Sequence, residues 1–242
     1  MNSADEAEES RPLYAQVREQ LIERIRSGAW KPGQLIPNEF EIAREFGVSQ
    51  GTARKAISAL ADEQLVHRRQ GRGTFVVQHT PAHVLFRFFQ LFDESRTQII
   101  PDSRKTVPVG AVANERERAE LGLDKGARVI RVARVRLRKD KPFIAESIVF
   151  PDALFPGLAE LPELPNTLYD FFQKTYGVLV VRADERITAV AADTETARVL
   201  EIDEGTPLLR VDRIAFGLVD RPLEWRVSLC HLQDAHYLAR LR

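Results

Sequence analysis

The sequence has 242 residues, 44% of them hydrophobic, and its 35 Lys and Arg balance its 35 Asp and Glu. This length accommodates two modest domains, and no apolar run approaches the roughly 20 residues that span a bilayer, so we expect a cytoplasmic protein without membrane contact. The single cysteine, Cys230, excludes an internal disulfide, and we expect no metal and no cofactor. Residues 1–10 hold four acidic and no basic side chains, which predicts a disordered acidic leader.

Positive charge gathers in residues 11–78, which carry 11 Lys and Arg against 7 Asp and Glu. The 164 residues that follow hold 24 of each sign. A basic excess confined to one domain is typical of phosphate binding, so we expect double-stranded DNA as its partner. Because the excess is modest, one domain alone would bind weakly, and a homodimer on palindromic half-sites is expected.

Two helices are predicted between residues 38 and 61. Asn38 can accept the amide of residue 41 while Glu41 returns to the amide of Asn38, an arrangement known as a capping box. Gly47 is expected to end this helix, and Ser49 to cap the next one. Apolar side chains recur at helical spacing in the second helix, so its opposite face and its amino-terminal end are expected to be exposed.

That exposed end carries Gln50, Thr52 and Arg54, which suit the major groove of DNA. Arginine can bond two acceptors on guanine and glutamine two edge groups of adenine, while threonine and helix-end amides suit phosphates. A hairpin with strands at 65–69 and 74–77 follows, and its glycine-containing turn would present Arg72 to a groove. The predicted DNA-binding residues are Asn38, Glu39, Ser49, Gln50, Gly51, Thr52, Arg54, Arg69, Gln70, Gly71, Arg72, Gly73 and Thr74.

A capped helix and a basic hairpin also occur in small helical domains that bind no DNA. The order and spacing of all three features favour a winged helix-turn-helix over residues 11–78.

Residues 79–84 are predicted to link this domain to a second one, 85–242, that binds an effector and dimerises. The apolar segment up to Phe92 is expected to begin a strand of that domain. Beyond it, residues 111–132 are echoed by residues 189–211, and each copy indicates a capped helix, an Asp-x-Gly turn and a long strand. Two such units predict an antiparallel sheet with flanking helices, so the fold class is α+β.

Alternation along a strand places Arg134, Arg136 and Arg138 on one face. Guanidinium groups bind carboxylate or phosphate through two hydrogen bonds, so an anionic small molecule is one prediction. The alternative is a solvated sheet face on which these arginines pair with Glu146 and Glu224. The pattern alone leaves both open.

The first domain resembles the GntR family of bacterial transcription regulators from Pro12 to Val76. Its motifs are Pro12-Leu13-Tyr14, Gly28-Ala29-Trp30-Lys31-Pro32-Gly33, Ile36-Pro37-Asn38-Glu39 and the run from Arg68 to Val76. Most relatives have Val-Ser-Arg where this chain has Val48-Ser49-Gln50. A different operator sequence is therefore expected.

The second domain resembles the effector domain, called UTRA, of the HutC-like branch of that family, whose fold is similar to chorismate lyase. The matching marks are Arg134-Val135-Arg136, Glu146, Phe155-Pro156-Gly157-Leu158, Thr167-Leu168-Tyr169, Tyr176-Gly177 and Arg221-Pro222-Leu223-Glu224. In relatives, the arginines, the threonine and the last glutamate hold effectors, several of which are phosphorylated sugars. A tyrosine common in those relatives is replaced here by Cys230, so a carboxylated or aromatic metabolite fits equally well. The resemblance implies effector binding by Arg134, Arg136, Glu146, Thr167, Glu224 and Cys230.

The predicted function is a ligand-responsive transcription regulator, with repression as the default and no enzymatic activity. Effector binding would change how two recognition helices are spaced on DNA and so weaken operator affinity. The alternative is an enzyme of chorismate-lyase-like fold tethered to a winged domain. The five histidines show no metal spacing, and neither a nucleophile elbow nor a glycine-rich phosphate loop is present in the sequence.

Overall fold

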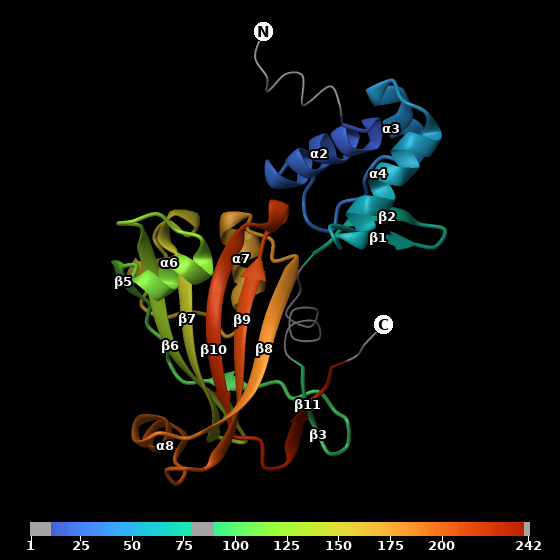
Figure 1. Cartoon of the computed structure of the whole chain (residues 1–242). Coiled ribbons are helices and arrows are strands. Elements are labelled where there is room, and N and C mark those ends of the chain that lie inside the picture. The colour runs from blue at the N-terminus through green and yellow to red at the C-terminus, as the bar shows by residue number, and fades with distance from the viewer. Residues whose placement is uncertain (1–10, 79–89, 240–242) are drawn as a thin grey trace. The chain divides into compact units, whose positions relative to one another are not determined.

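The computed structural model describes residues 11–78 and 90–239, which form parts of two compact units, Met1–His79 and Thr80–Arg242 (Figure 1). The predicted leader at 1–10 and the predicted linker at 79–84 lie outside the described residues. Within the described ranges, no helix combines the length and apolar character needed to cross a membrane.

The first unit contains three helices and a hairpin within residues 11–78. In chain order these are α2 (Leu13–Arg26), α3 (Glu39–Phe46), α4 (Gln50–Asp62), β1 (Val66–Arg69) and β2 (Gly73–Val76). The predicted capping box is confirmed: Asn38 Oδ1 accepts the amide of Glu41 at 3.0 Å, and Glu41 Oε2 accepts that of Asn38 at 2.8 Å. Gly47 ends α3 in the left-handed conformation, with φ 63°.

The core of this unit comes from all three helices and from the end of the hairpin that is opposite its turn. Its most deeply buried apolar side chains belong to Leu21, Ile42, Ala53, Ala56, Ile57, Leu60, Leu65 and Val76. The register of β1 and β2 runs from the pair Val66 and Val76 to the pair Arg69 and Gly73. The inner end of the hairpin is thereby anchored in the core, and its turn extends away from it.

The second unit is built on an antiparallel sheet, as the α+β prediction required. Residues 90–239 form a seven-stranded sheet in the order β4-β6-β7-β10-β9-β8, with β5 also paired to β6, and a separate β11-β3 pair. The strands are β3 (Leu91–Asp93), β4 (Asp102–Ser103), β5 (Val109–Val112), β6 (Arg128–Arg138), β7 (Lys141–Pro151), β8 (Arg182–Ala191), β9 (Pro207–Phe216), β10 (Pro222–Cys230) and β11 (Ala235–Tyr237). The α-helices are α6 (Glu115–Leu121), α7 (Leu168–Tyr176) and α8 (Thr194–Leu200).

The predicted duplication is confirmed in the elements themselves. Helix α6 begins at a capping box of Asn114 with Glu117, and α8 begins at Asp193, whose side chain accepts the amide of Thr196. Each helix is followed by a pair of long antiparallel strands, β6 and β7 in one copy and β9 and β10 in the other. These four strands lie next to one another and form the centre of the sheet.

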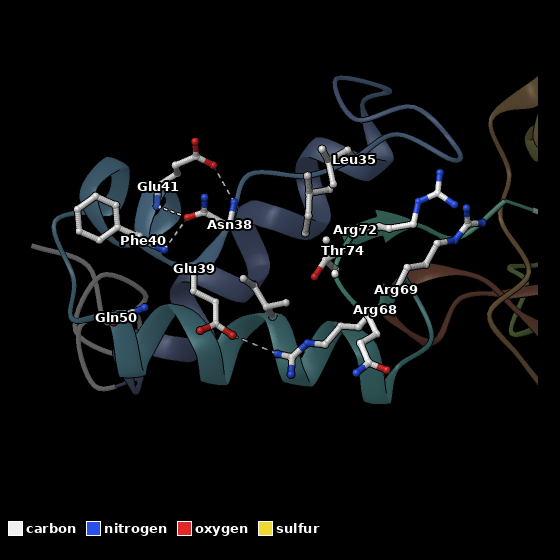
Figure 2. Close-up of a pocket in the computed structure, with 15 residues that line it drawn as sticks. Leu35, Asn38, Glu39, Phe40, Glu41, Gln50, Arg68, Arg69, Arg72 and Thr74 are labelled. Atoms are coloured by element: carbon white, nitrogen blue, oxygen red, sulfur yellow. Dashed lines mark hydrogen bonds and ion pairs between the residues drawn. The ribbon is translucent and has the colours of Figure 1, made fainter.

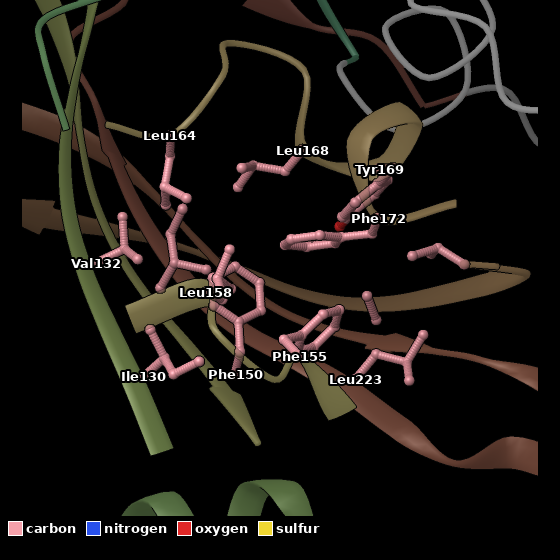
Figure 3. Packing of buried hydrophobic residues seen from close by; sticks show 13 residues of the cluster. Ile130, Val132, Phe150, Phe155, Leu158, Leu164, Leu168, Tyr169, Phe172 and Leu223 are labelled. Atoms are coloured by element: carbon pink, nitrogen blue, oxygen red, sulfur yellow. The ribbon is translucent and has the colours of Figure 1, made fainter. Parts of the chain in front are cut away.

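Helices α6 and α8 pack on one face of this sheet, and α7 packs on the other. Leu121 of α6 lies among Val129, Val149 and Trp225, whereas Phe172 of α7 lies among residues that alternate with these along the strands. Figure 3 shows the cluster around α7, which comprises Ile130, Val132, Ile148, Phe150, Phe155, Leu158, Leu164, Leu168, Tyr169, Phe172, Val180, Ala215 and Leu223. This packing fixes the amino-terminal end of α7 over the polar part of the same face.

Candidate DNA interface and effector site

The amino-terminal end of α4 is held by its cap and is open to solvent. Ser49 Oγ accepts the amide of Thr52 at 3.1 Å and lies 2.9 Å from the Thr52 hydroxyl. Gln50 and Gly51 are exposed, and the Arg54 side chain is 61% exposed. These side chains and amides are therefore available to an external partner.

A groove of about 750 Å³ lies between the start of α3, the start of α4 and the wing, the hairpin of β1 and β2 (Figure 2). Nine predicted DNA-binding residues line it: Asn38, Glu39, Gln50, Arg69, Gln70, Gly71, Arg72, Gly73 and Thr74. The other four, Ser49, Gly51, Thr52 and Arg54, lie outside its lining, at the cap and in the first turns of α4.

Glu39 connects α3, α4 and the wing through two ion pairs. Its carboxylate lies 2.7 Å from Arg54 Nε and 3.4 Å from Arg68 Nη2. Arg68 also donates to Ser58 Oγ at 3.1 Å. These ion pairs orient the two arginines, while direct contact of Glu39 with DNA stays a prediction.

Two glycines shape the turn of the wing. Gly71 has φ 70° and Gly73 has φ 106°, values that favour glycine. A Cβ added at Gly73 would lie 2.6 Å from Leu35 Cδ1, so the exposed Leu35 side chain would have to move. Arg72 is exposed at this turn, while Arg69 packs over Phe75 with its Cζ 5.0 Å from the ring centre.

A network of buried charged side chains occupies the α7 face of the sheet. Alternation along β6, β7, β9 and β10, together with their register, places these groups on one face. Its members, all buried, are Arg134, Arg136, Glu146, Arg213, Glu224 and Arg226. The structure thus brings four of the six predicted effector residues together and adds two arginines that the prediction missed.

Glu146 is the centre of the network. It accepts hydrogen bonds from Arg136 Nε at 2.9 Å and from Arg226 Nη1 at 3.0 Å. Arg226 also donates twice to Glu224, at 2.8 and 3.0 Å, and Glu224 accepts from the Tyr169 hydroxyl at 2.9 Å. The alternative of a solvated sheet face is therefore wrong: the pairing exists, but it is buried beneath α7 and the segment before it.

Arg134 differs from the other members of the network. It donates to the backbone oxygens of Asn166 at 3.3 Å and Pro165 at 3.2 Å, and its Nε has no hydrogen-bond partner. Among residues 11–78 and 90–239 no carboxylate forms an ion pair with it. Burial first, and then the positive charge of Arg136, lower the pKa of Arg134 to about 9. It remains a cation at neutral pH, and an anion would stabilise it.

Thr167 and Cys230 take no part in these ion pairs. Thr167 is half-buried at the N-cap of α7, directly after Asn166, and its hydroxyl makes no capping hydrogen bond. Cys230 is on the same sheet face as Glu224 by strand alternation, but it packs in an apolar cluster with Ile99 and Phe143. Burial raises the pKa of its thiol, so it behaves as an apolar wall.

Because Glu146 is paired with arginines, the effector unit should lose stability in acid. Burial would raise the pKa of this carboxyl, but the charges of Arg136, Arg226 and Arg134 together lower it to about 2 from an ordinary value of 4.5. A depressed pKa contributes stability that is present above 4.5 and is lost as the pH falls towards 2. We expect a loss of about 3 kcal/mol across this window.

Urea unfolding of the parent chain and of Glu146→Gln between pH 5 and pH 3 measures this loss. The difference in unfolding free energy between the two proteins should shrink as the pH falls. A difference that stays constant would show that Glu146 has an ordinary pKa.

Comparisons with known proteins cover both units. A model described as "Bacterial regulatory proteins, gntR family" matches residues 13–76, and a model described as "UTRA domain" matches residues 109–236. The mannosyl-D-glycerate transport/metabolism system repressor MngR of Escherichia coli (strain K12) is 33% identical over 215 residues, 87% of each chain. The HTH-type transcriptional repressor NagR of Bacillus subtilis (strain 168) is 30% identical over 206 residues, 85% of this chain and 84% of that protein.

A solved structure matches the second unit. The ligand-binding domain of a Bordetella bronchiseptica regulator assigned to the GntR family is 31% identical, with a TM-score of 0.58, over 64% of this chain and 98% of that one. The match confirms the predicted effector-domain fold. Both curated relatives are named as repressors, and no observation favours the enzyme alternative.

Proposed function

Since the chain belongs to the GntR family of bacterial regulatory proteins and is a ligand-responsive, DNA-binding transcription regulator, we propose that it is a homodimeric repressor released from its operator by a small anionic metabolite. The observation that carries the anionic ligand is Arg134, a buried cation with a free Nε donor and no acidic partner among the described residues.

The surroundings of Arg134 suit a carboxylate or phosphate. The Nε donor is unused, the Thr167 hydroxyl makes no capping bond, and α7 begins at Leu168, so its first amides carry partial positive charge. MngR is named for a mannosyl-D-glycerate system, and glycerate is itself a carboxylate. We therefore propose a small metabolite that bears at least one carboxylate or phosphate group.

On the DNA side, α4 enters the major groove and the wing lies beside it. Gln50 and Arg54 read bases, while Thr52 and Arg72 contact phosphates. Two copies of the chain place their α4 helices roughly 34 Å apart, one turn of the duplex, on a palindromic operator. Effector binding favours a state in which this spacing is lost, so operator affinity falls.

Arg54→Ala is expected to remove most of the preference for specific DNA. A base-edge contact by arginine contributes about 1 to 3 kcal/mol of discrimination, and the ion pair with Glu39 orients the guanidinium for it. Fluorescence anisotropy of the full chain with a duplex from upstream of its own gene, and with a random duplex, measures the preference at moderate salt.

Arg26→Ala is the matched control, because Arg26 is 63% exposed, pairs with Glu23 in α2 and lies outside the groove. It should lose some affinity for both duplexes but keep the preference. If the parent chain does not prefer its upstream DNA, the proposed function fails. If the parent chain prefers its upstream DNA and Arg54→Ala keeps that preference as Arg26→Ala does, the interface assignment fails.

A further inference from the structure

Phe40 is a large apolar side chain on the surface of α3, and it is 65% exposed. Phe40 does not pack in the core of the first unit, since the buried residues of α3 are Ile42 and Ala43. Its backbone is nonetheless fixed, because the Phe40 amide donates to Asn38 Oδ1 at 3.0 Å within the capping box. A single exposed apolar side chain is ordinary in itself, so its position decides whether it has a role.

Phe40 lies in the proposed DNA interface. It lines the same groove as Gln50 and the wing, and Figure 2 shows Phe40 and Gln50 towards one end of that groove with Arg69 and Arg72 towards the other. The arginines at the wing end suit phosphates. At the opposite end the Phe40 ring lies near Glu41 of the capping box, and an apolar ring offers no hydrogen-bond donor to a phosphate.

The side chains of Phe40 and Gln50 both suit an A·T base pair. The thymine C5-methyl group is the only apolar group that an unmodified base presents in the major groove, and phenylalanine is one of the side chains that contact it. Glutamine bonds the N6 and N7 groups of adenine in the same groove. Both side chains therefore favour A·T pairs.

We propose that Phe40 is a specificity-determining residue that contacts a thymine methyl group in each operator half-site, beside an adenine bound by Gln50. The proposal rests on the placement of α4 in the major groove. It adds the identity of two bases, a thymine and an adenine, that Phe40 and Gln50 select.

The test begins with DNA duplexes selected from a random pool by the full chain. Each thymine of the selected half-site is then replaced by deoxyuridine, which removes only the methyl group. At one thymine per half-site, the replacement should weaken binding about fourfold, the effect expected for one buried methyl group. For Phe40→Ala, thymine and deoxyuridine at that position should bind equally, and Phe40→Leu should keep part of the difference.

Leu13→Ala is the matched control, because Leu13 is 60% exposed in the same unit and lies outside the groove. It should keep the full methyl effect. The Gln50 contact is tested separately with 7-deazaadenine, which lacks N7: at one adenine it should weaken the parent chain but not Gln50→Ala.

The inference is overturned if no thymine is sensitive to loss of its methyl group, or if the sensitivity persists in Phe40→Ala. Failure to select any sequence from the pool would overturn the proposed function itself. The two failures are thus distinguishable.

Discussion

Arg134→Met is expected to abolish the response to an anionic effector while leaving the fold at least as stable as in the parent chain. The substitution breaks no ion pair with a described carboxylate, and its direct cost is the loss of the hydrogen bonds to the backbone oxygens of Asn166 and Pro165. A buried charge without an ion-pair partner is costly to desolvate, so its replacement by an apolar group of similar size offsets those two lost hydrogen bonds. Affinity for the effector should fall by about 2 to 5 kcal/mol, as for other truncations of a buried charged donor.

The measurement is the shift in melting temperature with carboxylated and phosphorylated sugars and amino-acid derivatives, followed by release of bound DNA. Arg128→Met serves as the control on the same strand, because Arg128 is 60% exposed and pairs with Asp152 at 3.3 Å. It should keep the parent response. A full response of Arg134→Met to a compound that stabilises the parent chain would contradict the assignment of Arg134 to the effector site.

Glu146→Ala is expected to have the largest effect on stability. Its carboxylate is the acceptor for Arg136 and Arg226, which are themselves buried, so its loss leaves two desolvated guanidinium groups with reduced compensation. Breaking a buried pair by removing one partner typically costs about 3 to 5 kcal/mol. Urea unfolding near pH 7, followed by a signal from the second unit, measures the change.

Glu201→Ala provides the comparison, because the pair of Glu201 with Arg104 is exposed on both sides. Its loss should change the unfolding free energy by less than about 1 kcal/mol. Equal effects of the two substitutions would mean that water enters the network and screens its charges.

Local features of the fold could be predicted from the sequence because their causes are local. The capping box at Asn38 and the left-handed Gly47 depend on residues within one turn of helix, and both are confirmed. The duplication likewise gave the pairs of long strands, because each copy carries its own turn and strand signals. Strand alternation was also sufficient to place Arg134 and Arg136 on one face.

Contacts between distant segments could not be predicted in this way. Arg136 and Arg226 both bind Glu146, across 10 and 80 residues of sequence, and the second contact depends on the register between β7 and β10. The alternative in which Glu224 pairs with the β6 arginines was wrong about its partner, which is Arg226. Alternation along β10 could have found Arg226, which is two residues from Glu224 on the same strand.

The wing shows the same limit on a smaller scale. Arg68 was left out of the predicted interface, although it lines the groove and pairs with Glu39 from 29 residues away. Its strand neighbour Arg69 was included. Only the packing of the hairpin against α3 and α4 shows that the two side chains have different surroundings.

The ion pairs of Glu146 do not include every residue of the proposed effector site, and this separation matters for how such regulators diverge in evolution. Because Glu146 already accepts hydrogen bonds from Arg136 and Arg226, the proposed effector site would keep these charges paired whichever metabolite it binds. Residues at its margin, such as Thr167 and Cys230, take no part in those ion pairs. If the proposed effector site is correct, substitutions at these two positions should change which molecule is bound while the ion pairs of Glu146 stay intact, so a new specificity could arise through a single change.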